Sequence, residues 1–217
     1  AGVGGISLVT AGTDTSVTVS NSSVSATAGG QVYLESDSGN VDVSSSTLST
    51  DSGNIYINAG QGSGPATFGD AVSITDSTVD AGSGQIQLSG STQDMYGFGV
   101  ALYGTAVTLS AAGGTLAFGD NQASSVSYSG GGVYVGSATL AGTGTLTMAG
   151  NAPNTYGYGV ELSGAQVTRN GAVTLSGTAP GGQGVYLYSS GIDTSGGPVT
   201  LMSTGGSVSV DYSTIAS

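Results

Sequence analysis

Carboxylates make up almost all of the ionisable chemistry in this chain. The 217 residues include no histidine and no cysteine, 13 Asp and Glu, and one cationic side chain, Arg169. Catalytic triads with histidine, zinc sites of His and Cys, and thiol nucleophiles are therefore excluded. A carboxylate pair that cleaves a glycosidic bond remains chemically possible. Glu161 is the best single candidate, and Asp42 holds the equivalent place several repeats earlier, too far away to share one bond.

We therefore predict no catalytic residue and no enzyme activity. A polysaccharide-processing enzyme is kept as the last alternative, because such enzymes also use β-helices. That alternative requires carboxylates gathered around Arg169, since lyases of this kind need a cation near the carbanion.

Aromatic and amide side chains in the loops suit binding. Met95–Leu102 (MYGFGVAL) and Thr155–Leu162 (TYGYGVEL) occupy equivalent places two repeats apart. Aromatic rings beside amides suit sugar rings or a partner protein. The alternative interpretation is that the tyrosines only cover the base of the loops and stabilise the corner. The predicted ligand-contact edge consists of Asp94, Tyr96, Phe98, Tyr128, Asn154, Tyr156 and Tyr158.

The charge of the chain limits its partners. With a net charge of −12 and one cationic side chain, the chain is not predicted to bind nucleic acid, and an anionic membrane surface would repel it. No apolar run approaches eighteen residues, so no membrane span is predicted.

The acidity favours solubility, although it also leaves calcium dependence open. No EF-hand loop or calcium-binding nonapeptide is present, so no metal and no cofactor is predicted. The candidate calcium ligands, if the chain binds that ion, are Asp37, Asp51, Asp70, Asp76, Asp80 and Asp94.

A repeat positions these residues. An apolar residue follows another after seven positions in each repeat, which predicts columns of stacked side chains in a solenoid. A further strand precedes each pair and alternates with period two, as in a strand with one buried face. These strands are predicted at Ile6/Leu8, Val32/Leu34, Ile55/Ile57, Ile86/Leu88, Leu116/Phe118, Leu146/Met148, Val173/Leu175 and Val199/Leu201. The seven-residue pairs are Val17/Val24, Val41/Leu48, Val72/Val79, Val100/Val107, Val133/Leu140, Val160/Val167, Val185/Ile192 and Val208/Ile215.

Length variation in the repeat is confined to one corner. Insertions in solenoids map to loops on one edge, often the binding edge. We therefore expect that edge to carry any ligand contact. The predicted loops are Ala59–Ala71, Ser89–Gly99, Gly119–Gly132, Ala149–Gly159 and Ser176–Gly184.

The repeat resembles a family of adhesins. Gly30–Ile57 (GQVYLESDSGNVDVSSSTLSTDSGNIYI) and Ala71–Gly90 (AVSITDSTVDAGSGQIQLSG) are similar to repeat regions of filamentous haemagglutinin-like exoproteins. These are adhesins exported by two-partner secretion, with relatives among autotransporter passengers. The resemblance covers essentially the whole chain. It implies a right-handed parallel β-helix at or outside the surface of a Gram-negative bacterium, with a role in adhesion, aggregation or biofilm. The family supplies no catalytic residues.

The predicted fold is all-β, a right-handed parallel β-helix of about eight three-strand coils. Residues 1–217 are expected to form one β-helix segment, a fragment of a longer repeat array. The expected function is that of a non-enzymatic shaft in a secreted surface adhesin. Its expected partners are a host or bacterial surface glycan or protein, and neighbouring β-helix segments of the same protein. The alternative is a structural segment of an extracellular filament that assembles end to end.

Overall fold

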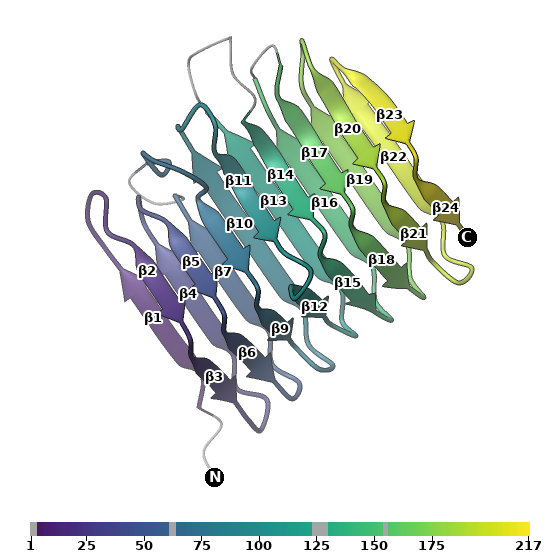
Figure 1. Ribbon diagram of the computed structural model, residues 1–217. Coiled ribbons are helices and arrows are strands. Elements are labelled where there is room, and N and C mark those ends of the chain that lie inside the picture. The colour runs from purple at the N-terminus through teal and green to yellow at the C-terminus, as the bar shows by residue number, and fades with distance from the viewer. Residues whose placement is uncertain (1–3, 61–63, 123–129, 154–155) are drawn as a thin grey trace.

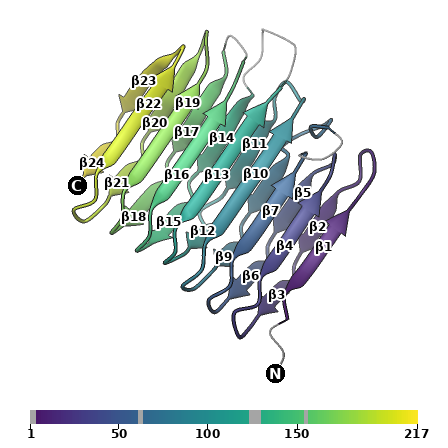
Figure 2. The same cartoon turned by 180° about the vertical axis from the view of Figure 1, so that it is seen from behind.

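The computed structural model describes residues 4–60, 64–122, 130–153 and 156–217. Its strands form three parallel sheets, A, B and C, each with eight strands. Strands of each sheet stack in chain order along one axis, so the N-terminus and the C-terminus lie at opposite ends of a rod (Figures 1 and 2). The predicted all-β parallel β-helix is thereby confirmed. No helix of the described residues has the length and apolarity that a membrane crossing requires.

Each sheet takes every third strand of the chain. Sheet A consists of β1 (Ile6–Thr10), β4 (Val32–Ser36), β7 (Ile55–Ala59), β10 (Ile86–Thr92), β13 (Thr115–Asn121), β16 (Leu146–Asn151), β19 (Val173–Thr178) and β22 (Val199–Thr204). Sheet B consists of β2 (Val17–Ser20), β5 (Val41–Ser44), β8 (Val72–Thr75), β11 (Phe98–Tyr103), β14 (Gly131–Gly136), β17 (Tyr158–Ser163), β20 (Gln183–Tyr188) and β23 (Ser207–Asp211). Sheet C consists of β3 (Ser23–Ala26), β6 (Thr47–Thr50), β9 (Thr78–Asp80), β12 (Thr108–Ser110), β15 (Thr139–Gly142), β18 (Gln166–Arg169), β21 (Gly191–Asp193) and β24 (Thr214–Ala216).

We call each consecutive A–B–C triplet of strands a coil and number the coils from β1–β3 (coil 1) to β22–β24 (coil 8). The core consists of inward side chains that stack in register from coil to coil. Val32 pairs with Ile55 and Leu34 with Ile57, and all four are fully buried. Because side chains alternate along each strand, the intervening residues point outward and form the three outer faces of the rod.

One residue in each coil turns the chain from sheet B to sheet C in the left-handed region of φ. Such a conformation is strained for residues other than glycine. In five of the eight coils a serine follows this residue. In coil 2 its side chain supports the corner: Ser46 Oγ donates to the carbonyl of Ser44 at 2.7 Å and accepts from the N–H of Ser22 at 3.1 Å. The corner residues with positive φ are Asn21, Ser45, Asp76, Gly104, Ser137, Gly164, Ser189 and Tyr212.

Sheets A and B approach each other closely near the edge that carries the loops between their strands, which we call the long-loop edge and which runs along the upper left side of Figure 1. Glycines of sheet A face glycines of sheet B in four consecutive coils, and a Cβ on the sheet A residue would overlap the opposite carbonyl oxygen. No other residue type allows this approach of two backbones. We call these pairs the glycine seam: Gly90–Gly99, Gly119–Gly132, Gly150–Gly159 and Gly177–Gly184.

The glycine seam corrects four of the predicted loops. These loops were predicted to begin at Ser89, Gly119, Ala149 and Ser176, but the strands of sheet A continue to Thr92, Asn121, Asn151 and Thr178. Those boundaries were wrong because the glycines at these positions do not form turns. They allow the two sheets to pack closely against each other. Only the loop predicted at Ala59–Ala71 lies between strand ends as expected.

The fixed spacing of seven residues fails in coil 4. Leu109, not Val107, stacks between Val79 and Leu140 in sheet C. Val107 is buried in the turn that directly precedes β12, where its carbonyl accepts a hydrogen bond from the N–H of Thr139 at 2.9 Å. The turn of coil 4 is two residues longer than the others, so the prediction for Val107 was wrong.

The predicted inward pair of coil 5 is also wrong. Thr115 and Ala117 pair with Ile86 and Leu88 and point inward, whereas Leu116 and Phe118 point outward. A strand with two apolar residues outside and two small residues inside reverses the expected pattern. The small residues leave room in the core for a large side chain from coil 6, which is described below.

Candidate functional site

Aromatic side chains are concentrated on the outer face of sheet B. Each of coils 4 to 7 contains a Gly-Val pair followed by an alternating strand, and the residues after Val point outward. Tyr134, Glu161 and Tyr186 are direct neighbours in one row across three coils. We call this surface the tyrosine face, and it consists of Phe98, Tyr103, Tyr134, Tyr158, Glu161, Tyr186, Tyr188 and Tyr212.

The rings of the tyrosine face form two groups on either side of Glu161. In the first, Tyr134 lies 5.1 Å from Phe98 and 5.3 Å from Tyr103 between ring centroids. In the second, Tyr158 stacks on Tyr186 at 5.5 Å with an interplanar angle of 17°. Tyr186 then contacts Tyr188 at 6.2 Å, and Tyr188 contacts Tyr212 at 5.8 Å. Such ring pairs contribute about 0.5–1.5 kcal/mol each beyond burial.

Glycines make room for the first group. A Cβ at Gly131 would lie 2.6 Å from the ring of Phe98, and one at Gly136 would lie 2.7 Å from the ring of Tyr134. Both rings therefore lie over backbone that carries no side chain. Tyr103 donates a hydrogen bond to Asp70 Oδ2 at 2.7 Å, and the N–H of Phe98 donates to Asp70 Oδ1 at 2.7 Å. The contacts fix the first group on the sheet.

Glu161 is a half-buried carboxylate among these rings. Burial raises its pKa to about 7 from an ordinary value of 4.5. Its charge in turn helps to raise the pKa of Tyr134 and Tyr158, for which burial is the larger cause. Burial also raises the pKa of Asp70, although the hydrogen bonds from Phe98 and Tyr103 oppose that shift. The site therefore holds a carboxyl group that changes charge near neutral pH.

Glu161→Gln is expected to stabilise the fold at pH 8. The folded protein keeps the proton of Glu161 up to about pH 7, while the unfolded chain loses it near pH 4.5. Stability therefore falls as the pH rises between these values, and the loss persists above pH 7. The shift corresponds to at most about 3 kcal/mol, which partial exposure reduces to about 1–2 kcal/mol. Urea unfolding at pH 5 and pH 8 measures the difference.

The control for this prediction is Asp51→Asn, which removes an exposed carboxylate at the corner between sheets C and A. That variant should keep the pH dependence of the wild type between pH 5 and pH 8. If Glu161→Gln and the wild type lose stability equally over this range, the raised pKa is wrong.

The residues of the predicted ligand-contact edge lie in two places. Tyr96 and Tyr156 are exposed at the long-loop edge, at 59% and 65% of their surface. Phe98 and Tyr158 are the first outward residues of β11 and β17 and belong to the tyrosine face. The two remaining aromatic and amide candidates, Tyr128 and Asn154, lie outside the described residues.

Asp94, the seventh predicted edge residue, organises a loop. Its carboxylate accepts from the N–H of Gly69 at 2.9 Å and from the N–H of Tyr96 at 2.8 Å. It also lines a hollow of about 310 Å³ at the edge, together with the exposed side chains of Phe68 and Met95. The exposed side chains of Phe68 and Met95 give this part of the edge an apolar surface.

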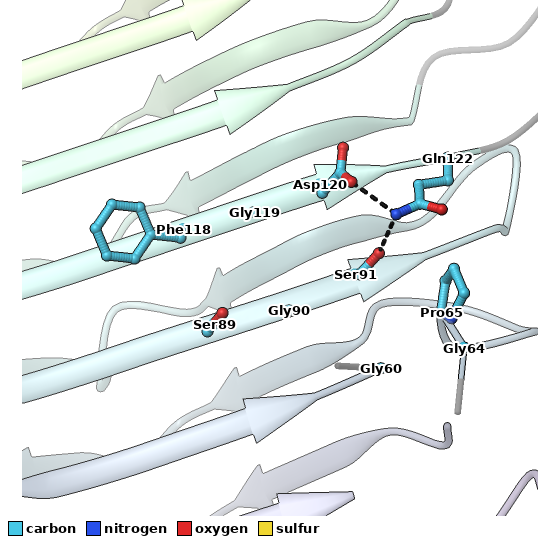
Figure 3. Close-up of a pocket in the computed structure, with 10 residues that line it drawn as sticks. All are labelled: Gly60, Gly64, Pro65, Ser89, Gly90, Ser91, Phe118, Gly119, Asp120 and Gln122. Carbon is cyan, nitrogen blue, oxygen red and sulfur yellow. Dashed lines mark hydrogen bonds between the residues drawn. The ribbon is translucent and has the colours of Figure 1, made fainter. Parts of the chain in front are cut away.

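A second hollow lies on the outer face of sheet A (Figure 3). Its volume is about 360 Å³, and Phe118 is exposed at one side of it. Gln122 Nε2 donates to Asp120 Oδ2 at 2.8 Å and to Ser91 Oγ at 3.1 Å. Asn151 Nδ2 donates to Asp120 Oδ1 at 2.8 Å. The hollow thus offers an aromatic ring beside a fixed group of polar side chains.

Arg169 lies inside the rod. It is fully buried, and its Nη2 donates to Thr115 Oγ1 at 2.8 Å while Nη1 is 3.5 Å from the carbonyl oxygen of Ala111. Its Nε has no hydrogen-bond partner among the described residues. Burial lowers the pKa of the guanidinium to about 10. A Cβ at Gly142 would approach Nη1 at 3.1 Å, so Gly142 and Thr115 together make room for this side chain.

Carboxylates of the described residues do not gather into a metal site. No group of three acidic side chains lies close enough to hold an ion in that part of the chain. Asp42 and Glu161 belong to the same outward row of sheet B but lie in coils 2 and 6. At about 4.8 Å per coil, roughly 19 Å separates them along the rod.

Sequence reasoning missed most of the tyrosine face. Tyr103, Tyr134, Tyr186 and Tyr188 were not selected, although the alternation after each Gly-Val pair places them outside. The same alternation, counted from Val167, places Arg169 inside. These signals are present in the sequence, but they lie in the strands and not in the loops that carry the other aromatic residues.

Comparison with family models finds no match for this chain, and comparisons with curated proteins and with solved structures find none.

Proposed function

We propose that the chain is a non-enzymatic shaft segment of a secreted adhesin at the surface of a Gram-negative bacterium. The tyrosine face carries this proposal. Its aromatic side chains lie in consecutive coils on the outside of the rod, where they add little to the core. Tyr188 and Tyr212 are exposed and the other rings are partly exposed, and surface patches rich in aromatic side chains mark interaction surfaces. Partners of the proposed adhesin are a glycan or a protein of a host or bacterial surface.

The geometry of the rod supports a mechanical role. Seven steps of about 4.8 Å give a length of roughly 34 Å for coils 1 to 8. Each coil contacts only its neighbours, so an array of such coils can extend a binding surface away from a cell. The separation of Asp42 from Glu161 and the burial of Arg169 favour binding over cleavage of a polysaccharide.

A binding experiment with three paired variants tests this proposal. Tyr186→Thr/Tyr188→Thr alters the tyrosine face, and Tyr96→Ser/Tyr156→Ser alters the long-loop edge. Tyr33→Thr/Tyr56→Thr is the control, because these rings contact each other at 6.0 Å on sheet A. The folded rod is expected to bind a glycan array or a cell layer saturably. One of the first two variants should lose at least about tenfold in affinity, and the control should not.

The same experiment separates the adhesin from the filament alternative. Terminal coils expose side chains whose counterparts in inner coils are fully buried: Leu8 is 40% exposed, and Val208 and Ile215 are 43% exposed. A further coil, from the same polypeptide or from a second copy, would cover them. A folded rod that binds no surface contradicts the adhesin proposal. Sedimentation of such a rod as linear oligomers would favour the filament.

A further inference from the structure

The outer surface of this protein carries no cationic side chain. Arg169 is the single Lys or Arg of the sequence, and it is fully buried. None of the 13 Asp and Glu can therefore find a cationic side chain on the surface of its own chain. Any cation that pairs with an outward carboxylate must come from another molecule or from solvent.

Glu161 differs from the other carboxylates in its surroundings. It lies between Tyr134 of β14 and Tyr186 of β20 in one row, with Tyr158 three residues earlier on β17. Burial alone accounts for the disfavoured ionisation of its carboxyl group, and no hydrogen bond from the described residues offsets it. A half-buried carboxylate without a partner is costly, and a cation placed against it would offset that cost.

We propose that the tyrosine face around Glu161 binds an arginine side chain of a basic partner protein. The guanidinium would meet the carboxylate of Glu161 with two N–H groups and contact the flanking rings. Arginine suits this surface because its planar group forms paired hydrogen bonds with carboxylates and packs on aromatic rings. The inference rests on the proposed function, since it names the chemistry of a partner for the same rod.

Other occupants fit the tyrosine face less well. A second copy of the chain would bring another net charge of −12 against Glu161, Asp70 and Asp211. A neutral sugar brings no charge that could offset the half-buried carboxylate of Glu161. Charge complementarity therefore favours a basic polypeptide.

A labelled glycine–serine peptide with two arginines is the probe, titrated against the folded rod by fluorescence anisotropy. A peptide with citrulline in place of arginine keeps the shape but has no charge, and a lysine peptide keeps the charge but has no planar group. We expect the arginine peptide to bind most tightly and the citrulline peptide at least about tenfold more weakly.

Two variants that each change the net charge from −12 to −11 localise the site. Glu161→Gln is expected to weaken binding of the arginine peptide at least about tenfold. Asp51→Asn removes the same charge from an exposed corner and should change binding by less than about twofold. Circular dichroism of each variant confirms that it is folded.

Three results would overturn the inference. They are no binding of the arginine peptide to the folded rod, equal binding of the citrulline peptide, or equal losses in Glu161→Gln and Asp51→Asn. If these occur while the rod still binds a surface glycan, the adhesin proposal stands without the arginine site. Binding of the arginine peptide by a rod that binds no surface would leave the arginine site and remove the adhesin role.

Discussion

Replacing Gly177 with alanine is expected to lower the free energy of unfolding by at least about 3 kcal/mol. The new Cβ would overlap the carbonyl oxygen of Gly184 on the opposite sheet. Both atoms belong to hydrogen-bonded strands, so neither can move away as a flexible side chain would. Overpacking in a core costs about 1–3 kcal/mol, and a clash between two backbones lies at or above the top of that range.

The control for the glycine seam is Gly64→Ala. A Cβ at Gly64 would meet no atom of the described residues within 4 Å. Its effect should stay within about 0.5 kcal/mol. Gly150→Ala, which repeats the clash in another coil, should resemble Gly177→Ala in urea unfolding followed by circular dichroism. Equal midpoints for Gly177→Ala and Gly64→Ala would show that the two sheets can separate at low cost.

Arg169→Met is expected to stabilise the protein by about 1–4 kcal/mol. The buried guanidinium has one good hydrogen bond, to Thr115, one long contact to Ala111, and an Nε without a partner. Removal of a poorly satisfied buried charge in favour of an apolar side chain of similar length often stabilises a fold. Methionine is flexible enough to fill the space beside Gly142. The unfolding midpoint measures the change.

Thr115→Val tests the same hydrogen bond between Arg169 and Thr115 by removing its acceptor. In the wild type it should destabilise by about 1–3 kcal/mol, because it removes the best acceptor of the buried Arg169. In the Arg169→Met background it should be nearly neutral. The two effects form a double-mutant cycle. A cost of Thr115→Val that is the same in both backgrounds would show that the hydrogen bond between Thr115 and Arg169 contributes nothing.

The repeat of apolar residues was enough to predict the parallel sheets and most of their register. It failed where a local exception was compensated by another coil. Thr115 and Ala117 replace the expected Leu116 and Phe118 in the core because Arg169, more than 50 residues later, needs that volume. The exception at Val107 arises from a longer turn, which a fixed spacing cannot detect. A periodic pattern predicts the inward residues of each coil separately. The core volume, however, is shared by side chains from neighbouring coils.

The candidate site was predictable only in part for a similar reason. Phe98 and Tyr158 were found because each follows a loop rich in aromatics. Their partners Tyr134 and Tyr186 stand in other coils and join them only when the register of sheet B is known. Of the glycines under the rings, Gly131 falls in the loop predicted at Gly119–Gly132, and nothing in the sequence set Gly136 apart. Their use as space for a ring depends on the sheet already being formed.

The burial of Arg169 has a practical consequence for anyone who handles this protein. Trypsin cleaves after lysine or arginine, and the folded rod offers it no accessible residue of either kind. After unfolding, one cut between Arg169 and Asn170 yields two pieces, too large for routine tryptic peptide mapping. Aldehyde fixatives and amine-reactive dyes likewise find no lysine side chain with which to react. A rod of this composition would persist among trypsin-like proteases and escape lysine-directed labelling of cell surfaces.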